Sequence, residues 1–404
     1  MSETMAAPPA QPAGLRSSWL LPLALYCAGH FVTDIYQSAL SIMQPALEQH
    51  FRLNFTESGI IAGVFLASSS MVQPLYGYIC DRIRSRLFSA LGPAVVALFI
   101  SFLAWGRGFG GLLAMVALAG IGVAAFHPQA AANVIAGITR NRSTAMSFFV
   151  SAGSIGMAIG PLLFSALLES GGLRRAAYGV APGLAVTLLL IVLLPPVREE
   201  RVKRPTFAWA PLRAVWKPMT ILFLLVMIRS IVSTTFTQFL PLYLDSTRHY
   251  SLGEASLTLA VFLLSGAVGG LAGGRLADRF GGRSVILLSM IGSVPFLALF
   301  VFGRGFWSLA GLIVGGTSLL FTMPVNIVIA QELAPTQAGT VSALMMGFAW
   351  GTAGLIFIPL TGWASDLWSM QTAFAGLIVF PLIGFLIALK LPRDAGNAAR
   401  AASA

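Results

Sequence analysis

The chain has 404 residues, of which 57% are hydrophobic and only 10% are charged. Soluble domains carry about 25% charged residues, so the composition excludes a soluble globule and indicates a polytopic membrane protein in contact with lipid. The net charge of +11 does not predict a nucleic-acid partner, because the cations lie in short breaks between apolar runs, as in membrane proteins generally.

Twelve apolar segments are long enough to cross a bilayer as helices, which takes about 20 residues each. The expected spans are residues 20–43, 56–79, 87–106, 109–137, 143–168, 174–194, 219–243, 254–277, 284–303, 306–331, 339–363 and 371–391. The longest break separates six spans from six. The predicted divisions are a disordered tail (1–18), an N-terminal six-helix bundle (19–194), a linker (195–218), a C-terminal six-helix bundle (219–391) and a second tail (392–404).

Arginine and lysine predict the orientation of the spans. With the N-terminus inside, inner segments hold 18 of the 25 cations, outer segments hold 6, and Arg229 lies within a span. Because positive charge accumulates on the cytoplasmic side, we expect both termini and the linker to be cytoplasmic.

A motif occurs twice at one spacing. GYICDRIRSR at 77–86 returns as GRLADRFGGR at 274–283, and Gly-Arg-Gly-Phe at 106–109 returns at 303–306, in each case 197 residues later. The repeat predicts a duplicated half. Two like-oriented halves joined by a basic linker are typical of transporters that work by alternating access.

Polar residues inside spans are costly and are functional hypotheses by default. The first span carries His30 and Asp34 on one face, with Tyr26 and Gln37 one turn to either side. The fourth span carries His127 and Gln129, the seventh carries Arg229 and Gln238, and the tenth carries Asn326.

Asp34 is the only acid deep in a span, and three interpretations are open. It carries protons, with His30 and His127 sharing the relay because imidazole titrates near neutrality. It pairs permanently with Arg229 and holds two helices together. It contacts only the substrate. Each histidine is alternatively a packed core residue.

Arg229 is a candidate anchor for an anionic substrate, since guanidinium is always charged and binds carboxylate or phosphonate in a bidentate manner. Its helix partners in substrate binding are expected to be Gln238 of the same span and Asn326 of the tenth. His127, Gln129, Tyr26 and Gln37 complete the expected substrate-binding set.

The repeated loop resembles the signature of the major facilitator superfamily. The resemblance implies two pseudo-symmetric six-helix bundles whose first and fourth helices line a cavity, which are the spans that carry the polar residues. It also implies a gating role on the cytoplasmic side for the acids and arginines of the motif; the alternative is that the arginines only set topology. The gating candidates are Asp81, Arg82, Arg86, Asp278, Arg279 and Arg283.

The fifth span contains GSIGMAIGP, which is similar to a glycine-proline signature of antiporters in that superfamily. Its candidate helix-packing residues are Gly153, Gly156, Gly160 and Pro161. Small residues let helices approach closely, so ordinary packing is the alternative interpretation. The motif favours export without proving it.

GHFVTD at 29–34 and FHPQ at 126–129 resemble the fosmidomycin-resistance branch of the superfamily. Gln129 departs from the pattern, because the branch usually has glutamate there. The resemblance implies a monomer in the bacterial inner membrane that exports small anionic or phosphonate-like drugs in exchange for protons.

The alternatives are a proton symporter for an organic anion and, from another class, an intramembrane enzyme. The chain has no HExxH, nucleophile elbow or phosphate loop to favour an enzyme. Cys27 and Cys80 suggest neither a disulfide nor a metal site. We therefore expect no cofactor and no metal.

Overall fold

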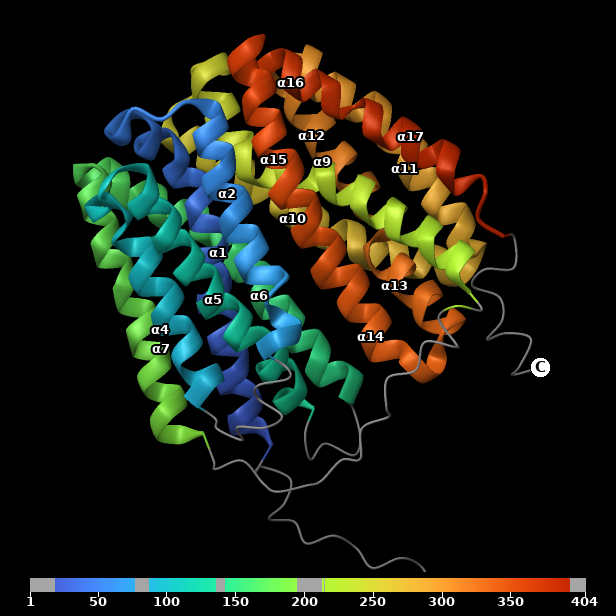
Figure 1. Ribbon diagram of the computed structural model, residues 1–404, viewed down its shortest axis with the longest axis horizontal. Coiled ribbons are helices and arrows are strands. Elements are labelled where there is room, and N and C mark those ends of the chain that lie inside the picture. Colours follow the sequence, from blue (N-terminus) through green and yellow to red (C-terminus); the bar gives the residue numbers. More distant parts are fainter. Residues whose placement is uncertain (1–18, 77–86, 136–141, 195–212, 214, 393–404) are drawn as a thin grey trace, which may run out of the picture.

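The computed structural model describes residues 19–76, 87–135, 142–194, 213 and 215–392. Over these residues all regular structure is helical, because a backbone inside lipid must satisfy its hydrogen bonds internally. Figure 1 shows two helical bundles side by side, the first half of the chain in blue to green and the second in yellow to red.

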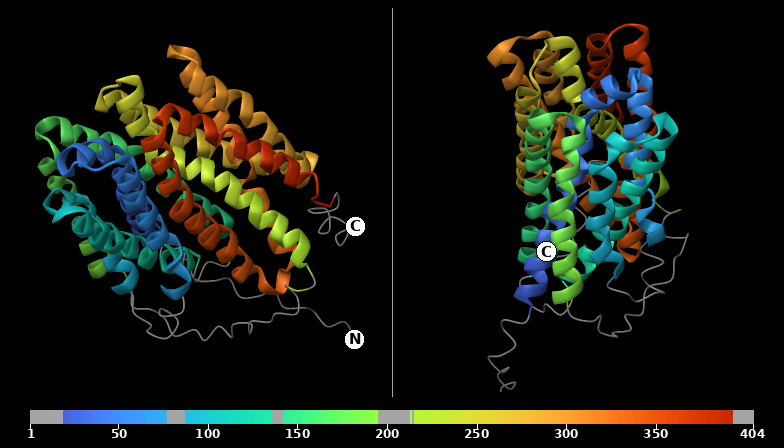
Figure 2. Two further views of the ribbon diagram at one scale, coloured as in Figure 1. Left: turned by 45° about the horizontal axis from the view of Figure 1, so that its top comes forward. Right: turned by 90° about the vertical axis from the view of Figure 1, so that its left-hand side faces the viewer.

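The first bundle contains six spans. Its helices are α1 (Leu20–Phe51), α2 (Phe55–Ser70), α4 (Leu87–Ser101), α5 (Gly108–Val134), α6 (Arg142–Gly171) and α7 (Val180–Leu193), with 3-10 turns η2 (Leu103–Trp105) and η3 (Leu173–Gly179). In the right-hand view of Figure 2, these helices stand close to parallel, as membrane spans do.

The second bundle begins with long helices and ends with broken ones. Its elements are α9 (Trp216–Arg248), α10 (Leu252–Phe280), α11 (Gly282–Phe302), α12 (Gly305–Leu320), α13 (Thr322–Leu333), η4 (Pro335–Gln337), α14 (Ala338–Ser342), η5 (Ala343–Phe348), α15 (Ala349–Leu367), α16 (Met370–Leu377) and α17 (Val379–Ala388). The segment η5 is a π-helix. π-Helical segments are rare in proteins, and those that occur are often found at functional sites.

The count of spans agrees with the prediction. Among the described residues, ten helical segments are long and apolar enough to cross a membrane. The other two spans are α4 and α1. With 15 residues, α4 is short, whereas α1 has 32 residues but carries buried polar side chains such as His30 and Asp34. Ten plus two gives the twelve predicted spans.

The duplicated half is visible in the backbone. Asn54 and Glu57 form a capping box at the start of α2, and the residues 197 positions later, Ser251 and Glu254, form one at the start of α10. Arg52 and His249, also 197 apart, end α1 and α9 with φ of 55° and 56°. Corresponding helices therefore begin and end in the same way, which confirms the repeat.

The two bundles are joined by polar contacts at one end of their interface. The Asp366 carboxylate of α15 accepts hydrogen bonds from the Phe55 and Thr56 amides (3.0 and 2.9 Å), at the start of α2. Ser41 of α1 donates to Gln238 of α9 at 3.2 Å. These two residues are also 197 apart, so a repeat-related pair meets where α1 and α9 cross. In the predicted topology this is the extracellular end.

The repeated loop motif is described only in its second copy, since Asp81, Arg82 and Arg86 lie outside the described residues. Arg283 donates to the carbonyls of Leu391 and Leu389 at 2.8 and 3.0 Å, beyond the end of α17. Arg279 lies over the Phe280 ring. The Arg283 contacts tie two helices of the second bundle together. A gating role for the motif stays a prediction.

Candidate functional site

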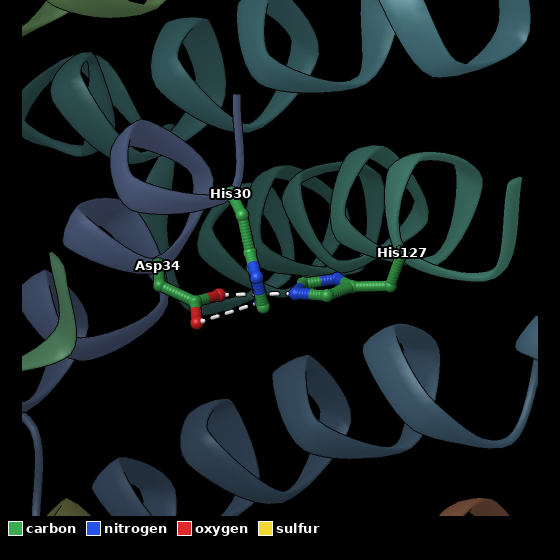
Figure 3. A group of neighbouring side chains, drawn as sticks. All are labelled: His30, Asp34 and His127. Atoms are coloured by element: carbon green, nitrogen blue, oxygen red, sulfur yellow. Dashed lines mark hydrogen bonds and ion pairs between the residues drawn. The ribbon is translucent and has the colours of Figure 1, made fainter. Parts of the chain in front are cut away.

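Three predicted residues meet inside the first bundle. His30 and Asp34 lie one turn apart on α1, and His127 reaches them from α5 (Figure 3). His30 and Asp34 are only 8% and 5% exposed. We call these three side chains the carboxylate–imidazole cluster.

Each imidazole contacts a different oxygen of the Asp34 carboxylate. His127 Nε2 lies 3.0 Å from Asp34 Oδ1, and His30 Nε2 lies 3.3 Å from Asp34 Oδ2. The rings approach edge to face, with centroids 4.9 Å apart. One buried carboxylate thus bridges two imidazoles, and each of the three side chains can accept a proton.

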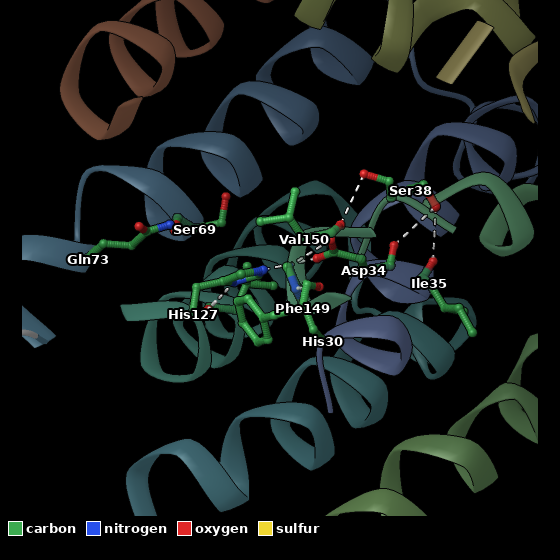
Figure 4. Close-up of polar contacts among 11 residues, drawn as sticks. His30, Asp34, Ile35, Ser38, Ser69, Gln73, His127, Phe149 and Val150 are labelled. Carbon is green, nitrogen blue, oxygen red and sulfur yellow. Dashed lines mark hydrogen bonds and ion pairs between the residues drawn. The ribbon is translucent and has the colours of Figure 1, made fainter. Parts of the chain in front are cut away.

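The outer nitrogens of both rings are fixed by the backbone. His30 Nδ1 lies 2.7 Å from the Phe149 carbonyl oxygen of α6, and His127 Nδ1 lies 3.0 Å from the Val123 carbonyl oxygen of α5. The Phe149 ring also stacks on His30, with centroids 4.1 Å apart and planes 25° apart. Figure 4 shows His30, His127 and Phe149 together, with Ser69 and Gln73 on the neighbouring span Phe55–Tyr76.

The glycines of the fifth span let α6 approach this cluster. A β-carbon on Gly153 would lie 2.5 Å from His30 Nε2 and 2.6 Å from Asp34 Oδ2, and one on Gly156 would overlap the Phe31 carbonyl oxygen. Gly160 similarly faces the Ile35 carbonyl. The glycine pattern therefore permits the close contact of α6 with α1, and Pro161 lies within the same helix.

Gly156→Ala is expected to lower the free energy of unfolding by about 1–3 kcal/mol, the usual cost of overpacking a tight interface. The added methyl must push α6 away from α1, which also carries the Phe149 carbonyl away from His30. Thermal unfolding of the purified variant in detergent checks the prediction.

The matched control is Gly270→Ala in α10, because a β-carbon there meets no atom within 4 Å. Alanine is the better helix former by about 1 kcal/mol, so this variant should match or exceed the parent. Equal stability of the Gly156→Ala and Gly270→Ala proteins would contradict the close-packing role of the fifth span.

Arg229 lies in the second bundle and does not contact Asp34. The residue is 5% exposed, and its guanidinium donates to Ser230 Oγ at 3.2 Å and leaves Nε without a partner. Among the described residues, the ion pairs found are the two that join Asp34 to its histidines. The interpretation of a fixed Asp34–Arg229 pair is therefore wrong for this conformation.

A small cavity opens beside Arg229. It is lined by Val226, Arg229, Met323, Ile327, Met345, Met346 and Trp350, from α9, α13, η5 and α15. The Trp350 indole nitrogen is buried there without a hydrogen-bond partner. The cavity has a volume of only about 10 Å³ in this conformation, about the space of one water. Buried polar groups are normally paired, so Arg229 Nε and the Trp350 indole nitrogen are two donors that acceptor oxygens of an anion would satisfy if the cavity widened.

The remaining predicted residues are not part of either group. The Tyr26 hydroxyl accepts from Asn133, the Gln129 side chain accepts from the Ser89 amide, and Gln238 accepts from Ser41. Asn326 is fully buried in α13, and neither of its side-chain polar atoms has a partner. Gln37 is partly exposed on α1.

Sequence reasoning missed the apolar side of the Arg229 cavity. Trp350 and the three methionines lie in ordinary apolar runs, so hydropathy gives no reason to single them out. It also missed the Phe149 carbonyl, since a backbone acceptor has no signature in the sequence. The pair of methionines beside a tryptophan at 345–350 was the one available signal, because methionine is common at adaptable binding surfaces.

The model of the Major Facilitator Superfamily matches residues 26–358 and 222–404. The chain is 28% identical over 366 residues to the fosmidomycin resistance protein of Escherichia coli (strain K12), covering 88% of this chain and 89% of that protein. It is 30% identical over 375 residues to the MFS-type transporter YfnC of Bacillus subtilis (strain 168), covering 90% and 91%.

Solved structures share the fold. A bacterial homolog of the human lysosomal transporter Spinster, inward-facing and unoccupied, superposes with a TM-score of 0.80 at 15% identity, covering 95% of this chain and 98% of that one. A D-xylose–proton symporter gives 0.73 at 14% identity, covering 94% and 99%.

A twelve-span helical fold with buried polar groups on its first, fourth, seventh and tenth spans defines a secondary transporter rather than an enzyme. The chain belongs to the Major Facilitator Superfamily.

Proposed function

We propose that the protein is a proton-coupled exporter of small anionic compounds, including phosphonate-like drugs, working by alternating access in the bacterial inner membrane with both termini in the cytoplasm. The observation that carries the proposal is the buried carboxylate–imidazole cluster. It places one carboxylate and two imidazoles, all groups that can accept a proton, on helices that line the cavity in this family.

Proton coupling is favoured by the composition of the cluster. A carboxylate held by two imidazoles at 3.0 and 3.3 Å gains or loses protons when a change of conformation alters its exposure, because burial penalises charge and neighbouring charge offsets that penalty. A purely structural contact would not need two titratable partners. The D-xylose–proton symporter shares the fold, so the architecture is compatible with coupling to protons.

We place the substrate at the Arg229 cavity, which has to widen from its present volume of about 10 Å³ when the bundles move. Its guanidinium supplies the charge, Trp350 supplies a further donor, and Met323, Met345 and Met346 supply a deformable apolar wall. Once widened, this lining would suit a small molecule with an acidic group at one end and an apolar body. The phosphonate fosmidomycin, named in the similar resistance protein, meets the charge requirement and is the natural first probe.

Export is favoured over uptake by the relatives. The chain resembles proteins named for resistance to fosmidomycin and, in Serratia proteamaculans, for multidrug resistance. The alternative, a proton symporter for an organic anion, would use the same groups.

Transport in oriented vesicles separates the two directions. Everted membrane vesicles with an acidic interior should accumulate fosmidomycin above the level of vesicles lacking the protein, and a protonophore should abolish the difference. Right-side-out vesicles with acid outside should not accumulate it. Accumulation in the second arrangement would overturn export and favour uptake.

A further inference from the structure

The hydrogen positions of the cluster follow from its geometry. A backbone carbonyl oxygen only accepts hydrogen bonds, so the nitrogen facing it must carry the proton. His30 Nδ1 faces the Phe149 carbonyl at 2.7 Å and His127 Nδ1 faces the Val123 carbonyl at 3.0 Å. Both rings, when neutral, are therefore Nδ1–H tautomers, and both Nε2 atoms present lone pairs.

Those two lone pairs point at the two oxygens of one carboxylate. Each separation, 3.0 Å to Asp34 Oδ1 and 3.3 Å to Asp34 Oδ2, is a hydrogen bond only when a proton lies between nitrogen and oxygen. With no proton there, acceptor faces acceptor at both contacts. With one proton, one of the two contacts becomes a hydrogen bond. At the other contact an Nε2 lone pair still faces a carboxylate oxygen in a buried site, where an unmade hydrogen bond is costly.

The His30 ring has no room to turn away from this arrangement, and the His127 ring is held by its contact with the Val123 carbonyl. Phe149 stacks on His30, and α6 passes so close at Gly153 that a single methyl would meet the His30 ring. Among the described residues, the titratable groups that act on Asp34 are His30 and His127. No lysine, arginine or further acid from the described parts of α2, α4, α6, α7 or α9 supplies a substitute charge.

We propose that the cluster is a two-proton site, with one proton shared by each Nε2–carboxylate contact, and that both are bound and released in each cycle. The role of these protons in transport rests on the proposed function, whereas the protonation of the cluster does not.

The cluster changes its net charge when it binds the two protons. Two neutral rings and one carboxylate give −1, and the addition of two protons gives +1. Exchange of two protons for a monoanion moves net charge across the membrane, so transport should respond to membrane potential as well as to pH.

The tautomers and the proton count can be measured directly on the full chain. The sequence has four histidines. His50 and His249 are exposed at the ends of α1 and α9, and His50→Gln with His249→Asn removes them; asparagine tolerates the positive φ at position 249. Nitrogen-15 NMR of labelled histidine in lipid nanodiscs then reports only the cluster. Carbon-13 carbonyl labelling of phenylalanine assigns His30 through Phe149, so no variant of the cluster is needed.

Between about pH 9 and about pH 5, which brackets the usual imidazole range, both rings should begin as Nδ1–H tautomers and both Nε2 atoms should gain a proton, in two steps. A neutral Nε2–H tautomer for either ring, or one ring that stays neutral throughout, would overturn the two-proton site. Two protonation steps without gradient-driven transport in the vesicle experiment would instead leave this inference standing and contradict the proposed function.

Discussion

Asp34→Asn is expected to reduce gradient-driven transport of fosmidomycin to the level of vesicles lacking the protein. Asparagine keeps the shape of the side chain and still offers an oxygen and a nitrogen to His127 and His30, so folding should survive with a loss of about 1–2 kcal/mol. It cannot hold a proton. Uptake driven by an imposed pH gradient and thermal unfolding of the same preparation check both parts.

Counterflow distinguishes a proton carrier at Asp34 from a substrate contact and from a purely structural role. Exchange of labelled for unlabelled substrate needs no net proton movement, so a proton carrier predicts that the variant retains counterflow. Loss of counterflow with normal stability would show that Asp34 contacts substrate. Full gradient-driven transport would show that the residue is only structural. Glu169→Gln, which removes an exposed carboxylate of α6, is the matched control and should transport normally.

Arg229→Ala is expected to weaken binding of anions by roughly tenfold to a hundredfold, because a hydrogen bond to a charged group contributes about 1.5–3 kcal/mol. A neutral ligand of the same shape should change by no more than about twofold, since it never used the charge. Equilibrium binding of 2-naphthoate and of 2-naphthamide to the purified protein makes the comparison, with fosmidomycin as a third ligand.

Arg174→Ala is the control, since Arg174 is an exposed arginine of η3, and it should bind all three ligands as the parent does. Equal weakening of acid and amide by Arg229→Ala would mean that Arg229 holds the second bundle together instead of binding charge. Arg229→Lys adds a finer test. It restores the charge without the planar fork, so it should recover part of the affinity for the carboxylate.

The two groups lie in different halves of the molecule. The carboxylate–imidazole cluster belongs to α1 and α5, whereas the Arg229 cavity belongs to α9, α13, η5 and α15. Proton and substrate therefore do not compete for the same side chains in the proposed mechanism. In that proposal they are linked through the movement of one bundle against the other. The contact of α1 with α9 at Ser41 and Gln238 lies on that boundary.

Within the cluster, the sequence predicted one contact and left the other open. His30 and Asp34 are four residues apart on one helix, so the α-helical period alone places them on one face. His127 is 93 residues from Asp34 in the chain. The FHPQ motif at 126–129 suggested its importance, but nothing in the sequence states which way α5 turns its side chains. The suggested Asp34–Arg229 pair failed for the same reason.

The sequence by itself determined the membrane class, the twelve spans, the duplication and the helices that carry polar groups. Each of these can be read from short stretches of sequence. The spans follow from the cost of placing polar atoms in lipid, and the duplication follows from motifs that recur 197 residues apart. The tertiary structure decided which polar groups meet. The rotation of each helix about its axis depends on packing, as where Gly156 admits the Phe31 carbonyl, and that rotation joins Asp34 to two imidazoles while it turns Arg229 toward a separate cavity.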